Sequence, residues 1–422
     1  MTNSKLKFVS KGRDTAVNFM PVIVFGIILH IALNVFTQAI PIISQTKYYS
    51  GLLIVELLMS CFAIYKCQSQ ISMQNNNLDI VIYLGITQII AYFANLFYEN
   101  FDCFDIHRLS AFLIMVICTY CFAWNSKVEK IELEKFLDTF ILITVIACIY
   151  NTIVNWLYIQ SFNPLIMMSY TNRFTSFFQT RSNYCLFLCI AVAISLYKYR
   201  TSKKILYIAL ISFFTLNIIM TNARTSIITL VLMFLLHIFL TTKNKTTYLL
   251  FLPILFAVFI FSPIPWERFI GSLDSFTEKY YLLFSRASAS DDFSNGRMEL
   301  WKFAFEDINP LNFVIGHGIG SKDAYLMFIN ASAASFHSIW IDLFFEGGLL
   351  FVVLYICLIA KIIKTVKTSL LNNDLKNMFY VFMSILIVSG FGDAIALPFM
   401  LDTSVIISTL LFITLPIASS NR

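Results

Sequence analysis

Long apolar runs separated by short polar segments divide almost the whole chain. Runs of about 17–25 mostly apolar residues match the length that a helix needs to cross the hydrocarbon core of a bilayer. Helices are the expected spanning form, because lipid offers no partner for a free backbone N–H or C=O group. The pattern predicts twelve transmembrane helices, at residues 18–40, 51–65, 78–98, 109–124, 136–158, 183–197, 205–220, 223–240, 247–262, 338–360, 377–396 and 403–418.

Composition argues against a soluble fold. Of the 422 residues, 58% are hydrophobic and only 13% are charged, and the mean hydropathy is +0.76. A soluble domain carries about twice that share of charged residues on its exterior. The segment from Met1 to Asp14 is polar, so we expect no cleavable signal peptide and expect the first span to act as the insertion signal. The predicted fold class is an all-α polytopic membrane protein.

Basic residues predict the orientation in the membrane. Lysines and arginines gather in alternate connections, such as residues 5–13, 127–135, 198–204 and 361–376. The positive-inside rule places these segments and both termini in the cytoplasm. The net charge of +6 follows from this asymmetry, so we expect no nucleic-acid partner. The chain then divides into nine helices at 1–262, one large outer loop at 263–336 that contains short helices, and three helices at 337–422.

Cysteines and acidic residues offer weak metal or disulfide candidates. The nine cysteines are odd in number and lie mostly within spans, so we interpret them, including the Cys118-x-x-Cys121 pair, as packing residues. Asp102-x-x-Asp105 with His107 could hold a divalent metal, but short carboxylates in an acidic loop are more often solvated. We therefore expect neither a metal nor a cofactor.

The large loop contains an amphipathic segment. Ser294 or Asn295 can cap a helix that Asn309-Pro310 would end. Met298, Trp301, Phe305 and Ile308 then form one apolar stripe, suited to lying on the bilayer or on the ends of the spans. Arg297 lies in the first turn of this helix. Because a helix start presents free N–H groups and the positive end of the dipole, an adjacent guanidinium favours an anion site.

Other candidate residues lie at predicted outer helix ends. Arg224 opens the eighth span, and Arg173 and Arg181 precede the sixth; each has the alternative of only reaching toward lipid headgroups. His337 is expected in the first turn of the tenth span, where the dipole favours the neutral imidazole that a general base needs. A bound diphosphate would oppose this effect, and a structural histidine is the alternative.

A glycine-rich segment precedes His337. Gly316-His-Gly318-Ile-Gly320-Ser-Lys322 is faintly similar to a phosphate-binding loop, but it lacks the GxxxxGK[ST] spacing and lies on the side predicted to be without ATP. We therefore do not interpret it as a nucleotide site.

The order of these motifs resembles that of the O-antigen polymerase and O-antigen ligase family. The matching segments are Asn222-Ala-Arg224, Gly296-Arg297 with Trp301, Gly318-Ile-Gly320, His337-Ser338 with Glu346-Gly347-Gly348, and Arg173 to Asn183. The resemblance covers about residues 170–350. It departs at Ser338, where the family usually has Asn.

The resemblance implies metal-independent, inverting glycosyl transfer at the periplasmic face of a bacterial inner membrane, as part of lipopolysaccharide biosynthesis. The donor would be a glycan on undecaprenyl diphosphate, and membrane lipids and a chain-length regulator are the other candidate partners. The candidate catalytic residues are His337, Arg297 and Arg224. The candidate substrate-binding residues are Arg173, Arg181, Trp301 and Glu346.

Three functions stay open at the level of sequence. We favour a polymerase, which joins lipid-linked repeat units; a ligase would pass the polymer to lipid A–core instead. The third alternative is a lipid-linked glycan flippase or permease. A flippase should line a central cavity with charge, whereas the informative charges here lie at outer helix ends.

Overall fold

The computed structural model describes residues 79–95, 109–110, 112–113, 116, 130–156, 174–176, 178, 181–221, 223–242, 297–306, 308–329, 336–368 and 371–392. This part of the chain is helical and contains no strand. Its helices are α3 (Asp79–Asn95), α5 (Lys130–Val154), α8 (Arg181–Ser202), α9 (Ile205–Met220), α10 (Arg224–Thr241), α14 (Arg297–Glu306), α15 (Pro310–Ile315), α16 (Ser321–Phe328), α17 (Ile339–Thr368) and α18 (Asn373–Gly392).

Seven of these helices overlap the predicted spans. Helices α5, α8, α17 and α18 contain segments long and apolar enough to cross a membrane, and α3, α9 and α10 are apolar but shorter. The prediction of an all-helical, membrane-spanning fold is confirmed to that extent. The spans expected at 18–40, 51–65, 247–262 and 403–418, and most of the one at 109–124, lie outside the described residues, so the total of twelve stays a prediction.

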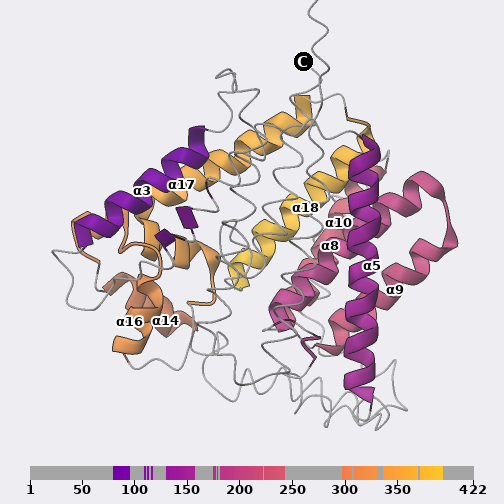
Figure 1. Ribbon diagram of the computed structural model, residues 1–422, viewed down its shortest axis with the longest axis horizontal. Coiled ribbons are helices and arrows are strands. Elements are labelled where there is room, and N and C mark those ends of the chain that lie inside the picture. The colour runs from indigo at the N-terminus through magenta and orange to yellow at the C-terminus, as the bar shows by residue number, and fades with distance from the viewer. Residues whose placement is uncertain are drawn as a thin grey trace, which may run out of the picture.

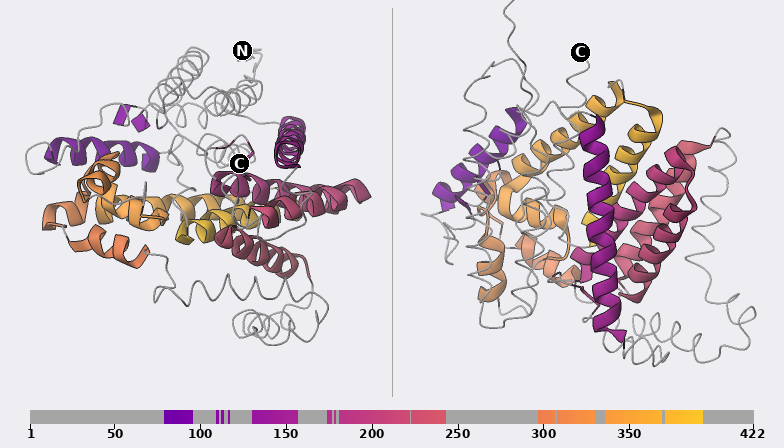
Figure 2. Two further views of the ribbon diagram at one scale, coloured as in Figure 1. Left: turned by 90° about the horizontal axis from the view of Figure 1, so that it is seen from below. Right: turned by 45° about the vertical axis from the view of Figure 1, so that its right-hand side comes forward.

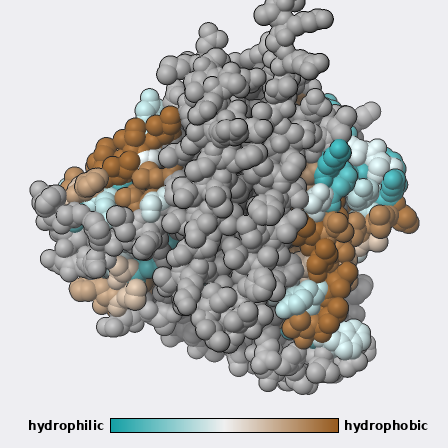
Figure 3. All heavy atoms as spheres, in the orientation of Figure 1, coloured by the Kyte–Doolittle hydropathy of each residue, from teal (hydrophilic) through white to brown (hydrophobic). Residues whose placement is uncertain are grey.

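The surface of α3 is inverted relative to that of a soluble helix. Its exposed side chains are apolar, among them Ile86, Ile90 and Phe93, whereas Gln88 and Asn95 are buried. The exposed face of α5 is apolar from Leu142 onward, and Figure 3 shows hydrophobic side chains over much of both helices. Large apolar faces of this kind are unfavourable in water and favourable in lipid. The pattern is therefore that of helices that face a bilayer.

The helices pack into one bundle (Figure 1). α18 runs between α17 on one side and α8 with α10 on the other. α8 is buried along most of its length, because α5, α9, α10 and α18 surround it. Successive helices α8 and α9 form an antiparallel hairpin, and its turn needs the left-handed backbone of Lys203, whose φ is 57°. α3 lies beside α17 at the far edge, which Figure 2 shows from two more directions.

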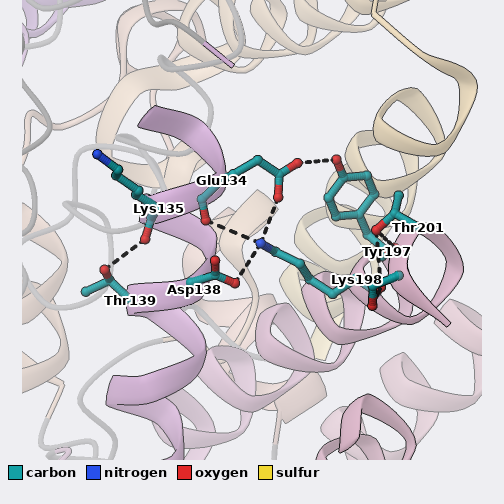
Figure 4. Close-up of polar contacts among 8 residues, drawn as sticks. Glu134, Lys135, Asp138, Thr139, Tyr197, Lys198 and Thr201 are labelled. Carbon is teal, nitrogen blue, oxygen red and sulfur yellow. Dashed lines mark hydrogen bonds and ion pairs between the residues drawn. The ribbon is translucent and has the colours of Figure 1, made fainter. Parts of the chain in front are cut away.

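One end of the bundle, which we call the Lys198 end, carries ion pairs that join α5 to α8 and α8 to α18. Lys198 of α8 pairs with Glu134 and Asp138 of α5 (Figure 4), and Arg200 pairs with Asp374 at the start of α18. These residues come from three connections that the charge pattern assigns to the same side of the membrane. The structure therefore brings the three basic segments together, as that assignment requires. The opposite end, which carries His337, is called the His337 end.

Candidate active site

The helix α17 begins at Ile339, one residue later than the predicted span. The first helical hydrogen bond runs from Asp342 N to Ser338 O at 2.9 Å, so Ser338 caps the helix and His337 lies outside it. His337 has φ 53°, a left-handed conformation that a right-handed helix cannot contain. The expectation that His337 lies in the first helical turn was therefore wrong, and His337 does not have the position at the helix start on which the expected dipole effect depends.

The peptide before His337 is held on both sides. Phe336 N donates to Asp342 Oδ1 at 3.1 Å, and Phe336 O accepts from Trp301 Nε1 at 2.7 Å. The Phe336 side chain is fully buried in a small apolar cluster with Ala304, Tyr325 and Phe345. The loop helix α14 and the start of α17 are thereby both bound to one residue, Phe336, through the peptide groups on its two sides. The predicted packing of Trp301 onto the span ends is confirmed, and its indole N–H has a specific acceptor.

A buried ion pair supports the same region. Lys322 Nζ lies 2.9 Å from Asp342 Oδ2, and the two side chains are 5% and 0% exposed. Burial alone would lower the pKa of Lys322, but the negative charge of Asp342 and of its acidic neighbours outweighs that effect, so the pKa is raised above that of an ordinary lysine. The Lys322 ammonium therefore stays charged and neutralises Asp342. Neither residue was singled out from the sequence.

A kink in α17 receives the glycine-rich segment. Gly348 has φ 66° and ψ −173°, which interrupts the helix and removes the helical partners of the carbonyls just before it. Two N–H groups of the segment replace those partners: His317 N donates to Phe345 O at 2.9 Å and Gly318 N donates to Glu346 O at 2.8 Å. The Glu-Gly-Gly motif thus forms a kink whose backbone groups are satisfied within the protein, as a lipid environment requires.

The backbone of the glycine-rich segment is hydrogen-bonded to the neighbouring helices α17 and α3. Gly316, Gly318 and Gly320 all have positive φ, and Gly320 N donates to Glu346 Oε1 at 3.0 Å. Gly316 O accepts from Asn95 Nδ2 of α3 at 2.8 Å. A phosphate-binding loop would keep its N–H groups free for the ligand. The N–H groups of His317, Gly318 and Gly320 already have protein acceptors, which agrees with the decision against a nucleotide site.

The histidine inside this segment, His317, is buried and packs against an aromatic ring. His317 is 2% exposed, and its ring stacks on Phe345 with centroids 4.3 Å apart. Its Nδ1 lies 3.0 Å from Asn312 Nδ2. An amide nitrogen can only donate, so Nδ1 is the acceptor and the imidazole is fixed in place. His337, by contrast, is half-buried and stands at the helix entry.

The loop helix α14 is shorter than predicted, and a second helix, α15, follows it. α14 ends at Glu306 instead of continuing to Asn309. Asn309 Oδ1 accepts from Asn312 N at 2.8 Å, and Pro310 occupies the first turn of α15. Asn-Pro was interpreted only as a stop signal, but Asn is also a good N-cap and Pro lacks the N–H that a first turn leaves unpaired. The pair therefore begins a second helix.

The predicted arginines occupy helix starts. Arg181 is the first residue of α8, Arg224 of α10 and Arg297 of α14. Arg297 lies one helical turn before Trp301 and is thus tied to the His337 turn. Arg224 belongs to another group of helices, since α10 packs on α18, α8 and α9. Arg173 lies outside the described residues, as do Gly296 and the acidic candidate at Asp102, Asp105 and His107.

A buried polar network lies just before Arg224. Asn217 Oδ1 accepts from Tyr184 at 3.0 Å and from Asn151 at 3.2 Å. One turn on, Thr221 Oγ1 contacts Cys185 Sγ at 2.9 Å and accepts from Ala223 N at 3.3 Å. The network therefore fixes the residue that precedes Arg224 relative to α5 and α8. Asparagines at the ends of predicted spans were the signal that could have indicated it.

Glu346 faces inward rather than toward solvent. It is 4% exposed, and both its carbonyl and its carboxylate hold the glycine-rich segment. Its role as a substrate-binding residue stays a prediction; the structure shows how it supports the loop. The missed residues are Lys322 and Asp342, whose contact joins positions 20 apart in the sequence and has no local pattern.

The comparison with protein families identifies one match. Residues 206–356 match the family described as O-antigen ligase, which confirms the resemblance to the O-antigen polymerase and ligase family. The matched segment runs from α9 into α17 and contains Arg224, Arg297 and His337. No curated protein matches the chain. The family and the apolar helices together indicate a multi-pass membrane protein related to membrane glycosyltransferases.

Proposed function

We propose that this chain is a bacterial inner-membrane O-antigen polymerase, which joins repeat units carried on undecaprenyl diphosphate at the periplasmic face. The observation that carries the proposal is the bond between Trp301 and Phe336. It brings the helix that Arg297 opens to the turn that holds His337, so that a phosphate-binding cation and a proton acceptor share one end of the bundle. The family match over residues 206–356 supports the same assignment.

The proposed reaction is a single displacement. A hydroxyl of the acceptor sugar attacks the anomeric carbon of the donor glycan, and the bond from that carbon to the diphosphate oxygen breaks. His337 accepts the hydroxyl proton, and undecaprenyl diphosphate leaves with the electron pair. Because the attack comes from the face opposite the leaving group, the anomeric configuration inverts. The reaction needs no metal if protein cations neutralise the leaving group.

The arginines supply that neutralisation in the proposed mechanism. The diphosphate already carries two negative charges and gains one more as its bond to the sugar breaks, near a low-dielectric membrane where preformed positive charge is most effective. We assign this role to Arg297 and Arg224, and we assign Arg181 and Arg173 to binding of the same anion or of the glycan. The ring of Trp301 is suited to contact with a sugar. Its indole N–H holds α14 in place by donating to Phe336 O.

A ligase is the second candidate, because the matching family carries that description. The two activities share the donor and the leaving group, and they differ only in the acceptor: a new lipid-linked repeat unit for a polymerase, and lipid A–core for a ligase. A flippase is less favoured, because the charged pair buried at the His337 end, Lys322–Asp342, is neutral as a unit and faces protein.

A lipopolysaccharide gel from a strain without this gene tests the proposal. Core that carries a single repeat unit, with the ladder absent, identifies a polymerase. Bare core, with polymer accumulated on the lipid carrier, identifies a ligase. An unchanged ladder contradicts both assignments. Complementation with His337→Ala should fail to restore the ladder at normal protein level, because the proton acceptor is missing.

A further inference from the structure

We propose that Asp342 is a positioning residue for the glycosyl transfer, because its one carboxylate holds the backbone that carries His337. The inference rests on the function proposed above and adds to it a residue outside the predicted site. Asp342 Oδ1 accepts from Phe336 N, and Oδ2 binds the Lys322 ammonium of the loop helix α16. Asp342 does not contact the reacting atoms in this proposal; it acts through the backbone N–H of Phe336, the residue that precedes His337.

The backbone at His337 needs such support. Its φ of 53° is one that residues other than glycine rarely adopt, and such a conformation persists only where the surroundings fix it. Before His337, the Phe336 peptide has Asp342 on its N–H and Trp301 on its carbonyl. After His337, Ser338 caps α17. The direction in which the imidazole leaves the backbone is therefore set by contacts on both sides.

The bond between Phe336 and Asp342 is shielded from water. Both Phe336 and Asp342 are 0% exposed, so no solvent competes for the donor or the acceptor. A hydrogen bond to an ionised carboxylate is stronger than one between neutral groups. A buried carboxylate must be paired, and Lys322 supplies the partner while it also holds α16 against α17. The ion pair thus gives the Asp342 carboxylate a partner and fixes its orientation toward Phe336.

The same peptide links two predicted catalytic groups. Trp301 lies one helical turn after Arg297, and its bond to Phe336 O fixes α14 relative to the His337 turn. Release of this peptide would let the proton acceptor and the proposed anion site move independently. Displacement of a catalytic group by about 1 Å can lower a rate by roughly a hundredfold. The expected consequence is a loss of kcat with little change in KM.

Two double variants isolate the hydrogen bond from the charge. Lys322→Met with Asp342→Asn removes both charges but keeps an amide oxygen that can accept from Phe336 N. Lys322→Met with Asp342→Leu removes both charges and the acceptor while it keeps a similar volume. Replacing a buried ion pair by neutral groups is often tolerated, so both proteins should accumulate. Lys302→Met serves as a control, since that exposed loop lysine pairs with Glu306 in the same helix.

Initial rates would be measured in membranes with equal amounts of each protein, using lipid-linked glycan extracted from the deletion strain. The Asn-containing double variant should stay within about threefold of wild type. The Leu-containing variant should lose roughly tenfold to a hundredfold in kcat, with KM nearly unchanged. Equal rates for the two double variants overturn the proposal, because the acceptor for Phe336 N would then have no role.

A second variant covers the case in which the double variants fail to accumulate. Trp301→Phe keeps an aromatic ring but removes the donor to Phe336 O. A fall in kcat supports positioning through this peptide, whereas a raised KM or no change overturns it. His337→Ala separates this inference from the proposed function. If His337→Ala is as active as wild type, the assigned function of His337 fails; if it is inactive while the two double variants are equal, only the positioning inference fails.

Discussion

Lys198 of α8 and Glu134 of α5 form an ion pair of 2.7 Å at the end of the bundle opposite His337. Asp138, one turn further along α5, lies 2.6 Å from the same ammonium, and Tyr197 donates to Glu134 at 2.5 Å (Figure 4). Only Lys198 is strongly buried; the side chains of Glu134 and Asp138 are 32% and 57% exposed. One lysine therefore joins two turns of α5 to α8 where the helices leave the predicted membrane region.

Removal of the Lys198 charge should destabilise the bundle without affecting catalysis. Lys198→Met removes the ammonium that lies between two neighbouring carboxylates, those of Glu134 and Asp138. Because the carboxylates are partly solvated, we expect a loss of about 1–3 kcal/mol in the free energy of unfolding, below that of a fully buried pair. The check is the thermal unfolding temperature of the purified protein in detergent.

Lys204→Met is the matched control, because Lys204 is exposed on the same hairpin. It should change the unfolding temperature by little. Normal stability of Lys198→Met would contradict the structural role of the cluster. Loss of transfer activity at normal stability would contradict the expectation that this cluster takes no part in catalysis.

Exchange of Arg297 for lysine should impair glycosyl transfer. A guanidinium can bind a phosphate through two parallel N–H bonds, whereas an ammonium acts as a point charge. We expect at least a tenfold loss of kcat/KM at equal protein level, seen as a shortened or absent ladder on the lipopolysaccharide gel. Lys302→Met, in the same helix, should leave the ladder intact. Near-normal activity of Arg297→Lys would refute the diphosphate clamp.

The two loop glycines should differ sharply in their tolerance of a methyl group. A Cβ on Gly316 would lie 2.4 Å from Gly347 N, in addition to requiring φ 74°, whereas a Cβ on Gly318 meets its first neighbour at 3.5 Å and is limited only by φ 91°. Gly318→Ala should cost about 1–2 kcal/mol from the left-handed backbone. Gly316→Ala should abolish folded protein, because backbone atoms at the kink cannot move aside. Membrane levels of the two variants compare them; equal levels would contradict the packing of the segment onto the kink.

The spans of the described helices could be predicted because apolar run length is a local property. Residues 205–220 were predicted to be a span and form α9, and the helix start at Arg224 was within one residue. The contacts around His337 were not predictable in this way. Lys322 and Asp342 come from separate helices, and Trp301 of α14 binds Phe336 in the turn before α17, so no spacing rule connects either pair. The kink at Gly348 was also missed, because a Gly-Gly pair within an apolar run does not specify a backbone angle.

The ion pair at Lys322 should contribute a constant stability across the neutral range. The pKa of Lys322 is raised in the folded protein, so its contribution is fully present below the pKa of an unfolded lysine, about 10.4, and is lost as the pH rises through the raised value. Wild type and the Lys322→Met, Asp342→Asn double variant should therefore differ in unfolding temperature by the same amount from pH 6 to pH 9. A difference that changes within that window would contradict the assignment.

Substitutions in the polar network before Arg224 should lower the stability of the protein by different amounts. Tyr184→Phe removes one of the two donors to Asn217 Oδ1 and should cost about 1 kcal/mol. Asn217→Leu removes the acceptor itself and leaves the donors of Tyr184 and Asn151 buried. Because lipid offers no replacement acceptor, the loss of stability should be larger, about 2–4 kcal/mol. Leu216→Ala is the control, since Leu216 lies next to Asn217 but is 53% exposed on the apolar surface.

Unfolding temperatures in detergent give the order of these three variants. If Leu216→Ala proves as destabilising as Asn217→Leu, the polar contacts are not what holds α9 against α5 and α8. If the order holds, transfer activity should fall with Asn217→Leu more than the loss of folded protein explains. Thr221, which accepts from Ala223 N, lies one turn beyond Asn217, so a shift of that turn displaces the residue directly before Arg224.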